Sequence, residues 1–460
     1  MTKAARRLLA VLLALAVVGG GTPAQANGDP TPGAQTSTDS LFGEFGNGGY
    51  DVTHYDLAMT YGEIDNSIEV NETVTLTATQ DLSEFSLDLA GLTVDEVTVD
   101  AAPATFARTG HKLVITPATP LSNGATATLV VKYHGVPTPW DDPDGSVEGW
   151  LQVSHGITAL NEPLGAMTWY AVNNRIDDKA RFSISVTTDK RLTVAGIGVL
   201  KSRVVTGGSA TTKWVEDVPV SPYLTSVTIM PLRQVVGRGA GVRTWSYLDS
   251  GTRTALPGWG DKALNFLSDR YGAYPFKAGG VIALQGLPYS LETASRPVLE
   301  PQAPRMVVVH EAAHQWFGDS VTPRDWGDIW LNEGFATYAS WLWLDSVKPG
   351  WAERRYQSLY ADPASSDRWS PAPAALGHPA YLFDTESVYE RGAMTLMALR
   401  HRIGKAKMRT LMRTWYSRHR GQSVRTSDFV ALAEEISGRQ LDGFFDAWLY
   451  QATKPGSAYR

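Results

Sequence analysis

The pattern of apolar and polar positions divides the chain into two parts. Between Tyr50 and about Val235, short segments alternate apolar and polar residues with the period of two that is typical of strands. The clearest of these segments are 70–77, 85–89, 94–99, 112–115 and 127–131. Because turn residues separate them at short intervals, we predict an antiparallel β domain, a saddle or sandwich, over residues 50–236.

From residue 237 to residue 460 helical periodicity dominates. Apolar residues three and four apart predict helices over 263–271, 328–345 and 386–402. Ser427 and Gly438 are of the residue types that begin and end a further helix. An apolar run at 280–284 predicts a strand among the helices. We therefore expect an α+β multidomain protein, with a mostly helical domain that carries a small β-sheet after the β domain.

The first 49 residues are predicted to lie outside both domains. Residues 1–26 have the features of a secretory signal peptide: positive residues, an apolar run at 8–18, and small residues around Ala26. Residues 27–49 are rich in Pro, Gly, Ser and Thr, which predicts a flexible leader. We expect a secreted, extracellular protein cleaved near Ala26. No later run approaches twenty apolar residues, so we expect no membrane anchor.

Composition excludes several classes of partner. The 460 residues carry a formal net charge of -6, and loss of the positive signal peptide would make it more negative. An acidic protein is a poor ligand for nucleic acid or for an anionic membrane. The chain has no cysteine, so an exported form would depend on its core, and on bound metal, instead of disulfides. Oligomeric state stays open.

Two histidines four residues apart carry the clearest chemistry. They are His310 and His314 in the segment His-Glu-Ala-Ala-His, and Glu333 follows after a gap of eighteen residues. On a helix, positions i and i+4 share a face, so both imidazoles can reach one metal ion. Two histidines and one glutamate leave an open position on a tetrahedral zinc, as catalytic sites do. Glu311, beside the histidines, is the candidate general base for hydrolysis by a metal-activated water.

A surface helix with two solvated histidines is the plain alternative, and the neighbours argue against it. Apolar residues surround the histidines on every side, so the helix is expected to be buried. Pro304 suits the start of this helix and Gly318 its end. Gly334, after Glu333, costs a helix about 1 kcal/mol relative to Ala, which a close approach of backbone or substrate would explain.

The segment from His310 to Gly318, together with Trp-Leu-Asn-Glu-Gly-Phe-Ala at 330–336, resembles the active-site stretch of the aminopeptidase N-like zinc peptidases, peptidase family M1. The resemblance extends from about Tyr50 to Gln451. It implies an N-terminal β domain followed by a thermolysin-like catalytic domain, one zinc ion per chain, and removal of N-terminal residues from peptides. Peptides with a free N-terminus are therefore the expected partners.

The same resemblance implies three further site residues. Tyr389, in Val-Tyr-Glu-Arg-Gly-Ala, matches the tyrosine that stabilises the oxyanion. Glu292, in Tyr-Ser-Leu-Glu-Thr, stands where the family's Gly-Ala-Met-Glu-Asn segment binds the substrate's α-ammonium. Glu162 in the β domain resembles the Gln or Glu that helps to hold that amine.

Some positions depart from the family pattern. Tyr289 and Thr293 replace the Gly and Asn of the Gly-Ala-Met-Glu-Asn segment, which puts residue preference in doubt. Ser340 stands where the family usually has an acid that orients a ligating histidine. Asp325 and Asp328 are possible substitutes for that acid.

The sequence thus predicts a secreted zinc aminopeptidase. Two alternatives stay open: an endopeptidase or other hydrolase on the same scaffold, and a non-catalytic binding protein with a degenerate zinc site. A degenerate site would not need Glu311. The preferred N-terminal residue cannot be derived from these motifs.

Overall fold

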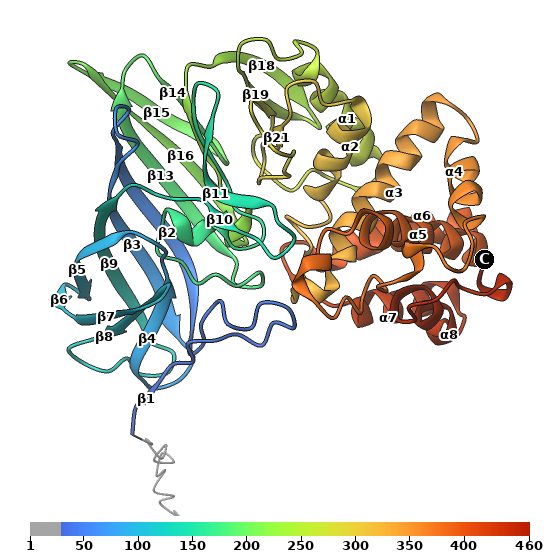
Figure 1. Cartoon of the computed structure of the whole chain (residues 1–460), viewed down its shortest axis with the longest axis horizontal. Coiled ribbons are helices and arrows are strands. Elements are labelled where there is room, and N and C mark those ends of the chain that lie inside the picture. Colours follow the sequence, from blue (N-terminus) through green and yellow to red (C-terminus); the bar gives the residue numbers. More distant parts are fainter. Residues whose placement is uncertain (1–28) are drawn as a thin grey trace, which may run out of the picture.

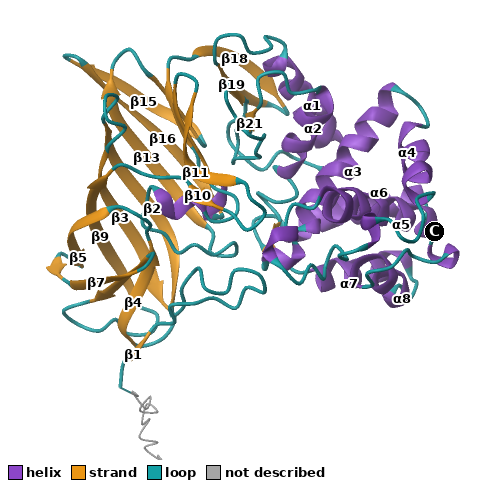
Figure 2. Cartoon of the chain, in the orientation of Figure 1, coloured by secondary structure: helices purple, strands orange, loops and turns teal. Residues whose placement is uncertain are grey.

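The computed structural model describes residues 29–460, and the predicted signal peptide lies outside them. Figure 1 shows a strand-rich part and a helical part side by side, joined where their loops meet. Figure 2 makes the division plain, with strands gathered on one side and helices on the other. The predicted fold class, a β domain followed by a mostly helical domain with a small sheet, is confirmed.

The β domain is built on one large sheet of eight strands. In spatial order these are β15 (Val199–Thr206), β16 (Ser209–Val220), β13 (Ala180–Asp189), β2 (Tyr50–Tyr61), β3 (Ile68–Ala78), β9 (Thr126–Gly135), β5 (Thr93–Val99) and β6 (Ala102–Pro103). Along β3 every second residue is buried, because side chains alternate between the two faces of a strand, and β2 shows the same alternation on either side of an irregularity between Val52 and His54. All neighbours run antiparallel except β2 and β13, which are parallel.

Two smaller sheets complete this domain. One has the order β1 (Thr31–Pro32), β4 (Leu82–Asp88), β8 (Lys112–Thr116) and β7 (Thr105–Thr109). The other has the order β10 (Trp140–Asp141), β11 (Val147–Val153), β12 (Gly156–Leu160), β17 (Val227–Met230) and β14 (Thr193–Gly196). The loop after β12 carries Glu162 toward the helical domain.

The helical domain begins with a small sheet. Its order is β18 (Arg233–Gly239), β19 (Val242–Leu248), β20 (Ile282–Ala283) and β21 (Val298–Leu299), and a two-stranded pair, β22 (Thr322–Pro323) and β23 (Ser423–Val424), lies further along. The predicted boundary between residues 236 and 237 falls inside β18, which pairs with β19 throughout. By sheet membership the helical domain starts at Arg233, after β17.

Eight α-helices follow. They are α1 (Leu256–Tyr271), α2 (Arg305–His314), α3 (Trp330–Val347), α4 (Trp351–Tyr360), α5 (Gly392–Ile403), α6 (Lys405–His419), α7 (Thr426–Ser437) and α8 (Asp442–Phe445), counted within residues 29–460. The predicted helix at 386–402 is split: Thr385–Arg391 is π-helical and α5 continues from it. Ser427 lies inside α7 and is not its cap. The residue before the helix is Arg425, whose amide donates a hydrogen bond to the Asp428 carboxylate, and this bond fixes the start of α7. Gly438, in a left-handed conformation, ends α7 as predicted.

The expectation of a flexible leader is wrong for residues 29–49. Asp39 accepts hydrogen bonds from the Leu41 and Phe42 amides at 2.9 Å and from the Trp326 amide at 2.8 Å. Phe42 is buried, with its ring 6.3 Å from that of Trp326. The composition of the segment favoured disorder. Its order comes from the Asp39 carboxylate, which caps the turn at residues 39–42, and from the buried side chains of Phe42 and Phe45. It ties the β domain to the start of α3.

One continuous hydrophobic core extends through both domains. Polar contacts also cross between them: the Lys179 ammonium donates to the carbonyls of Asp319 and Ser320 at 3.2 and 2.9 Å, and the Asn332 amide group donates to the Tyr223 hydroxyl at 3.2 Å. Within residues 29–460, no helix is both long and apolar enough to span a bilayer.

Candidate metal and substrate site

The two motif histidines lie on one face of α2, at the centre of the molecule. Their ring centroids are 4.8 Å apart and nearly perpendicular, as expected for neighbours one turn apart. Pro304 is the extended residue before the helix, and the helix ends at His314, before the Gly318 that the sequence suggested. Val308, Val309, Ala312 and Ala313 are buried around the histidines, which confirms the prediction of a buried helix.

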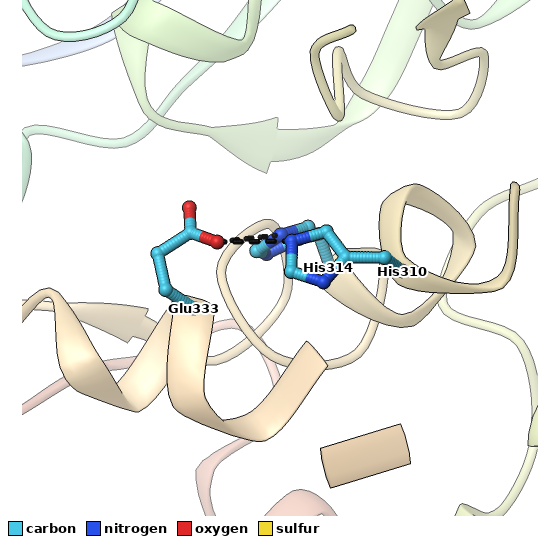
Figure 3. A group of neighbouring side chains, drawn as sticks. All are labelled: His310, His314 and Glu333. Carbon is cyan, nitrogen blue, oxygen red and sulfur yellow. Dashed lines mark hydrogen bonds and ion pairs between the residues drawn. The ribbon is translucent and has the colours of Figure 1, made fainter. Parts of the chain in front are cut away.

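Glu333, in the first turn of α3, faces both histidines (Figure 3). Its Oε2 lies 3.0 Å from Nε2 of His310 and 3.5 Å from Nε2 of His314. Ligand atoms of the three residues all fall within 4.8 Å of one another, close enough to share a cation. Two imidazole nitrogens and one carboxylate oxygen are the donor set of a catalytic zinc site with an open position.

The electrostatics of the three residues suit a cation. Burial alone would raise the pKa of Glu333, but the charge of His314 and hydrogen bonds from both imidazoles lower it to about 2. Burial lowers the pKa of His310, so this ring is held in the neutral form that binds metal. Nε2 of His314 is buried, and within residues 29–460 its one polar contact is the long one of 3.5 Å to Glu333. A metal ion would satisfy that nitrogen, so the residues fit zinc.

The outward-facing ring nitrogens have partners that the sequence did not suggest. Nδ1 of His314 lies 3.2 Å from the Phe317 carbonyl, and Nδ1 of His310 lies 3.5 Å from the Thr337 hydroxyl. Ser340 does not reach a histidine, because its hydroxyl donates to the Thr337 carbonyl at 2.8 Å. Thr337 follows Glu333 by four residues on the same helix, so the helical period could have identified it.

Neither aspartate considered as a substitute reaches the histidines. Asp325 accepts from the Gly327 amide at 2.8 Å and caps the turn before α3. Asp328 accepts from the Thr426 hydroxyl at 2.6 Å and joins α3 to α7. Both are structural.

Three more carboxylates lie around the metal-binding cluster. Glu311, Glu292 and His314 have ligand atoms within 4.8 Å of one another, as do Glu162, Glu292 and Glu333. Burial raises the pKa of Glu311 well above its ordinary value. One oxygen each of Glu162 and Glu292 is buried without a hydrogen-bond partner in the described chain. Buried carboxylates without partners are costly, so this arrangement calls for a cationic group from outside the protein.

Backbone and side-chain contacts fix Glu292 in place. The Gln315 amide group, one residue after His314, donates to the Glu292 carbonyl at 3.0 Å. The Tyr223 hydroxyl of the β domain also reaches the Glu292 carboxylate. Asp319 lies behind the site, with both carboxylate oxygens buried and unpartnered in residues 29–460. Sequence reasoning missed Tyr223 and Asp319, because nothing in the local pattern marks them.

Tyr389 reaches the cluster from the π-helical segment before α5. Its ring stacks on that of His310 at a centroid distance of 5.7 Å and an angle of 11°. Burial raises the pKa of the Tyr389 hydroxyl well above its ordinary value, so the group remains a neutral donor. The π-helical turn shifts the register that an α-helix would give and aims this side chain inward.

These residues line one cavity of about 680 Å³ between the domains. All seven side chains that the sequence singled out contribute to it: Glu162, Glu292, His310, Glu311, His314, Glu333 and Tyr389. Tyr289 also lines it, but its hydroxyl is turned to the β domain and donates to the Val147 carbonyl at 3.0 Å. The Thr293 hydroxyl donates to the Arg296 carbonyl at 2.8 Å and is outside the lining.

Comparison with known proteins finds that the chain is similar to zinc peptidases and aminopeptidases. Residues 291–448 match the model of the peptidase family M1 domain. Aminopeptidase 2 of Candida albicans is 24% identical over 438 residues, which cover 86% of this chain and 46% of that protein. Aminopeptidase N of Lactococcus lactis is 32% identical over 160 residues, 32% of this chain and 19% of that protein. The chain therefore spans about half, or less, of the length of these curated relatives.

Solved structures match over nearly the whole chain. The crystal structure of an M1 zinc metallopeptidase from Deinococcus radiodurans superimposes with a TM-score of 0.85 and 29% identity, covering 92% of this chain and 99% of that one. A mutant of the Deinococcus radiodurans protein bound to a Tyr-Ser-Ala substrate gives a TM-score of 0.84 at the same identity. The likeness thus includes both domains and is not confined to the metal-binding segment.

Proposed function

Because residues 291–448 match the peptidase family M1 domain and both domains resemble solved M1 zinc metallopeptidases, we propose that the chain is a zinc aminopeptidase of this family, which removes the N-terminal residue from peptides. One observation carries the proposal: two buried carboxylates, Glu292 and Glu162, each with one oxygen that lacks a partner in residues 29–460, lie beside a three-residue metal-binding cluster. The cluster can hold the zinc ion that hydrolysis requires, and the two carboxylates can bind a positively charged group of the substrate.

Each residue has a defined task in this mechanism. Zinc bound by His310, His314 and Glu333 would supply Lewis-acid chemistry at the scissile carbonyl and lower the pKa of a water. Glu311 takes a proton from the attacking water and returns it to the leaving amine. Tyr389 donates its hydroxyl proton in a hydrogen bond to the carbonyl oxygen as negative charge develops there.

Glu292, with Glu162 beside it, binds the α-ammonium of the substrate. A charge-assisted hydrogen bond to an ammonium satisfies the buried carboxylates and fixes the first peptide bond beside Glu311. An internal peptide bond has no ammonium to offer, so the arrangement favours an exopeptidase. The Tyr-Ser-Ala substrate bound to a similar solved structure supports peptides as the substrate class.

The test compares aminoacyl-4-nitroanilides with their N-acetylated counterparts, with zinc and with a chelator. We expect turnover of the free amines only, lost on chelation and regained with zinc. Glu292→Gln should lower kcat/KM for the free amine by at least about tenfold, since it weakens a charged contact. Glu300→Gln, which removes a carboxylate from the exposed rim of the same cavity, is the matched control.

Two results would contradict the proposal. Equal turnover of acetylated and free substrates would indicate an endopeptidase or another hydrolase. No turnover of any substrate by protein shown to contain zinc would indicate a binding protein.

We also propose that the protein is exported, on the strength of the signal-peptide pattern in residues 1–26. Mass spectrometry of the protein after expression in a host that processes such peptides tests this directly. A mature N-terminus near residue 27 outside the cytoplasm is expected. An intact N-terminus on protein retained in the cytoplasm would refute export.

A further inference from the structure

A second cavity, of about 460 Å³, lies among helices α1, α3, α5 and α6 and contains none of the metal-binding residues. Its apolar lining consists of Phe266, Leu342, Met408 and Met412, together with the rings of Tyr271 and Tyr338. Its charged lining consists of Arg270, Arg400, Lys405, Arg409 and one acid, Asp269. The volume is in the range of small-molecule sites, roughly 300–1,000 Å³.

The charge of this cavity is opposite to that of the chain. Four cations and a single acid line it, whereas the whole chain carries -6. In residues 29–460 none of the four cations forms an ion pair with a carboxylate, although other arginines of the same helices do, such as Arg418 with Glu435. Arg270 and Arg400 are half-buried, so their charges are screened less than those of the exposed Lys405 and Arg409, and positive charges beside apolar walls favour an anion.

One of the two arginines, Arg270, is held in place by an aromatic ring. The Arg270 guanidinium lies 4.3 Å from the ring centre of Phe266. Burial raises the pKa of the Tyr338 hydroxyl, and the positive charges of Arg400 and Arg270 act against that rise. Rings that fix a guanidinium in advance reduce the entropy lost when a ligand binds.

Two polar groups of the lining lack partners. The Tyr271 hydroxyl and Nε of Arg270 are buried and make no hydrogen bond within the described chain. Tyr271 is 3% exposed, so water reaches it poorly. A buried donor without an acceptor costs free energy, and in native proteins such a group usually has a function or a bound partner. Both groups are donors, and an anion supplies acceptors.

We propose that this cavity binds a small organic carboxylate with an apolar body, such as an arylalkanoic acid. The carboxylate oxygens accept from Arg270, Arg400 and the Tyr271 hydroxyl, since guanidinium groups bind planar carboxylates in pairs of hydrogen bonds. The apolar body packs on Met408, Met412 and Leu342. Methionine side chains adapt to ligands of varied shape, which suits a class of acids more than a single compound.

The site is close to the metal-binding cluster but separate from it. The Tyr271 ring packs edge to face on Phe317, 4.8 Å away, three residues after His314. Tyr338 and Leu342 belong to α3, the helix that carries Glu333. The proposal does not depend on the aminopeptidase activity, and its test uses binding as the readout.

Crystals of the zinc-loaded protein soaked with 3-(4-bromophenyl)propionate locate the ligand through the anomalous signal of bromine. We expect a peak in this cavity. A peak only at the metal-binding cluster, or none at a saturating concentration, would overturn the proposal, because a carboxylate can also bind to zinc.

Calorimetric titration with the same acid tests the contacts. Tyr271→Phe removes a hydroxyl that has no partner and should leave the fold intact; we expect it and Arg270→Met each to raise Kd about tenfold, as for loss of one charge-assisted contact. Lys262→Met, which removes a positive charge from α1 outside the cavity, should leave Kd unchanged. The uncharged amide of the acid should not bind. An unchanged Kd in both cavity variants would refute this site.

Discussion

Gly334 and Gly392 touch through their backbones. A Cβ atom built on Gly334 would lie 2.9 Å from the Cα of Gly392, and the reverse contact is equally short. Gly334 follows the metal-binding Glu333, and Gly392 comes three residues after Tyr389. The absence of both side chains lets α3 approach α5 closely enough for Glu333 and Tyr389 to reach the same cavity.

Gly334→Ala should therefore disturb the site. A methyl group at 2.9 Å from backbone atoms cannot be absorbed by a rotamer change, so the helices must separate. We expect a loss of about 1–3 kcal/mol in unfolding free energy, as for other overpacked cores, with weaker metal binding. Thermal unfolding and metal titration measure the two effects.

Gly258→Ala in α1 is the control, because no atom lies within 4 Å of its added Cβ and the position is helical and exposed. It should stabilise the protein by about 0.5–1 kcal/mol. If Gly334→Ala behaved like Gly258→Ala, the close contact would not matter.

Glu311→Gln tests the general base. The amide cannot accept a proton from water at neutral pH, so turnover should be almost abolished while the three metal-binding residues are untouched. The rate with a free-amine anilide and the zinc content by mass spectrometry are measured on the same sample. Substantial turnover with zinc retained would exclude the role proposed for Glu311.

Tyr389→Phe tests the oxyanion donor. The stacking of the ring on His310 is kept and only the hydroxyl is lost. We expect kcat to fall by about 10²–10³, as for removal of one oxyanion donor, with little change in KM. An increase in KM alone would show that Tyr389 binds the substrate without stabilising the transition state.

The buried Glu72 should make the unfolding free energy depend on pH, and this effect does not involve the metal-binding cluster. It is buried in the β domain, where its carboxylate accepts from the Tyr133 hydroxyl and the Ala171 amide, both at 2.9 Å. Burial raises its pKa from 4.5 to about 8. Because the folded pKa is above the unfolded one, the contribution of Glu72 is fully present below pH 4.5 and is lost as the pH rises toward 8.

Glu72→Gln imitates the protonated acid at every pH. The melting temperature of the native chain should therefore fall relative to that of the variant between pH 5 and pH 8, by the equivalent of roughly 2–4 kcal/mol. Glu69→Gln, at an exposed position of the same strand, should show no such trend. Parallel pH curves for Glu72→Gln and the native chain would contradict the assignment.

The sequence predicted those features that depend on local periodicity. Strand alternation located β3, β4, β5, β8 and β9, and the i, i+4 spacing put His310 and His314 on one face. The predicted close approach at Gly334 is confirmed by its contact with Gly392. The roles of Glu162, Glu292 and Tyr389 came from family resemblance and stay predictions, although their side chains share one cavity with the metal-binding cluster.

Features that depend on contacts between distant segments could not be predicted from the sequence. Asp39 and Phe42 have no periodicity to mark them, yet they dock the leader on Trp326. Tyr223 reaches Glu292 from the other domain, and Lys179 of that domain contacts the backbone of Asp319. Such pairs join segments that are far apart along the chain, and no local pattern encodes them. The same holds for the unpartnered donors of the second cavity, which require the packing of four helices to be known.

The most direct test of the account is anomalous scattering at the zinc absorption edge from crystals of the zinc-loaded protein. We predict one strong peak between α2 and α3, at about 2.0–2.2 Å from a nitrogen of His310, a nitrogen of His314 and a carboxylate oxygen of Glu333. A peak bound by other residues, or no peak in protein that contains zinc, would contradict the account.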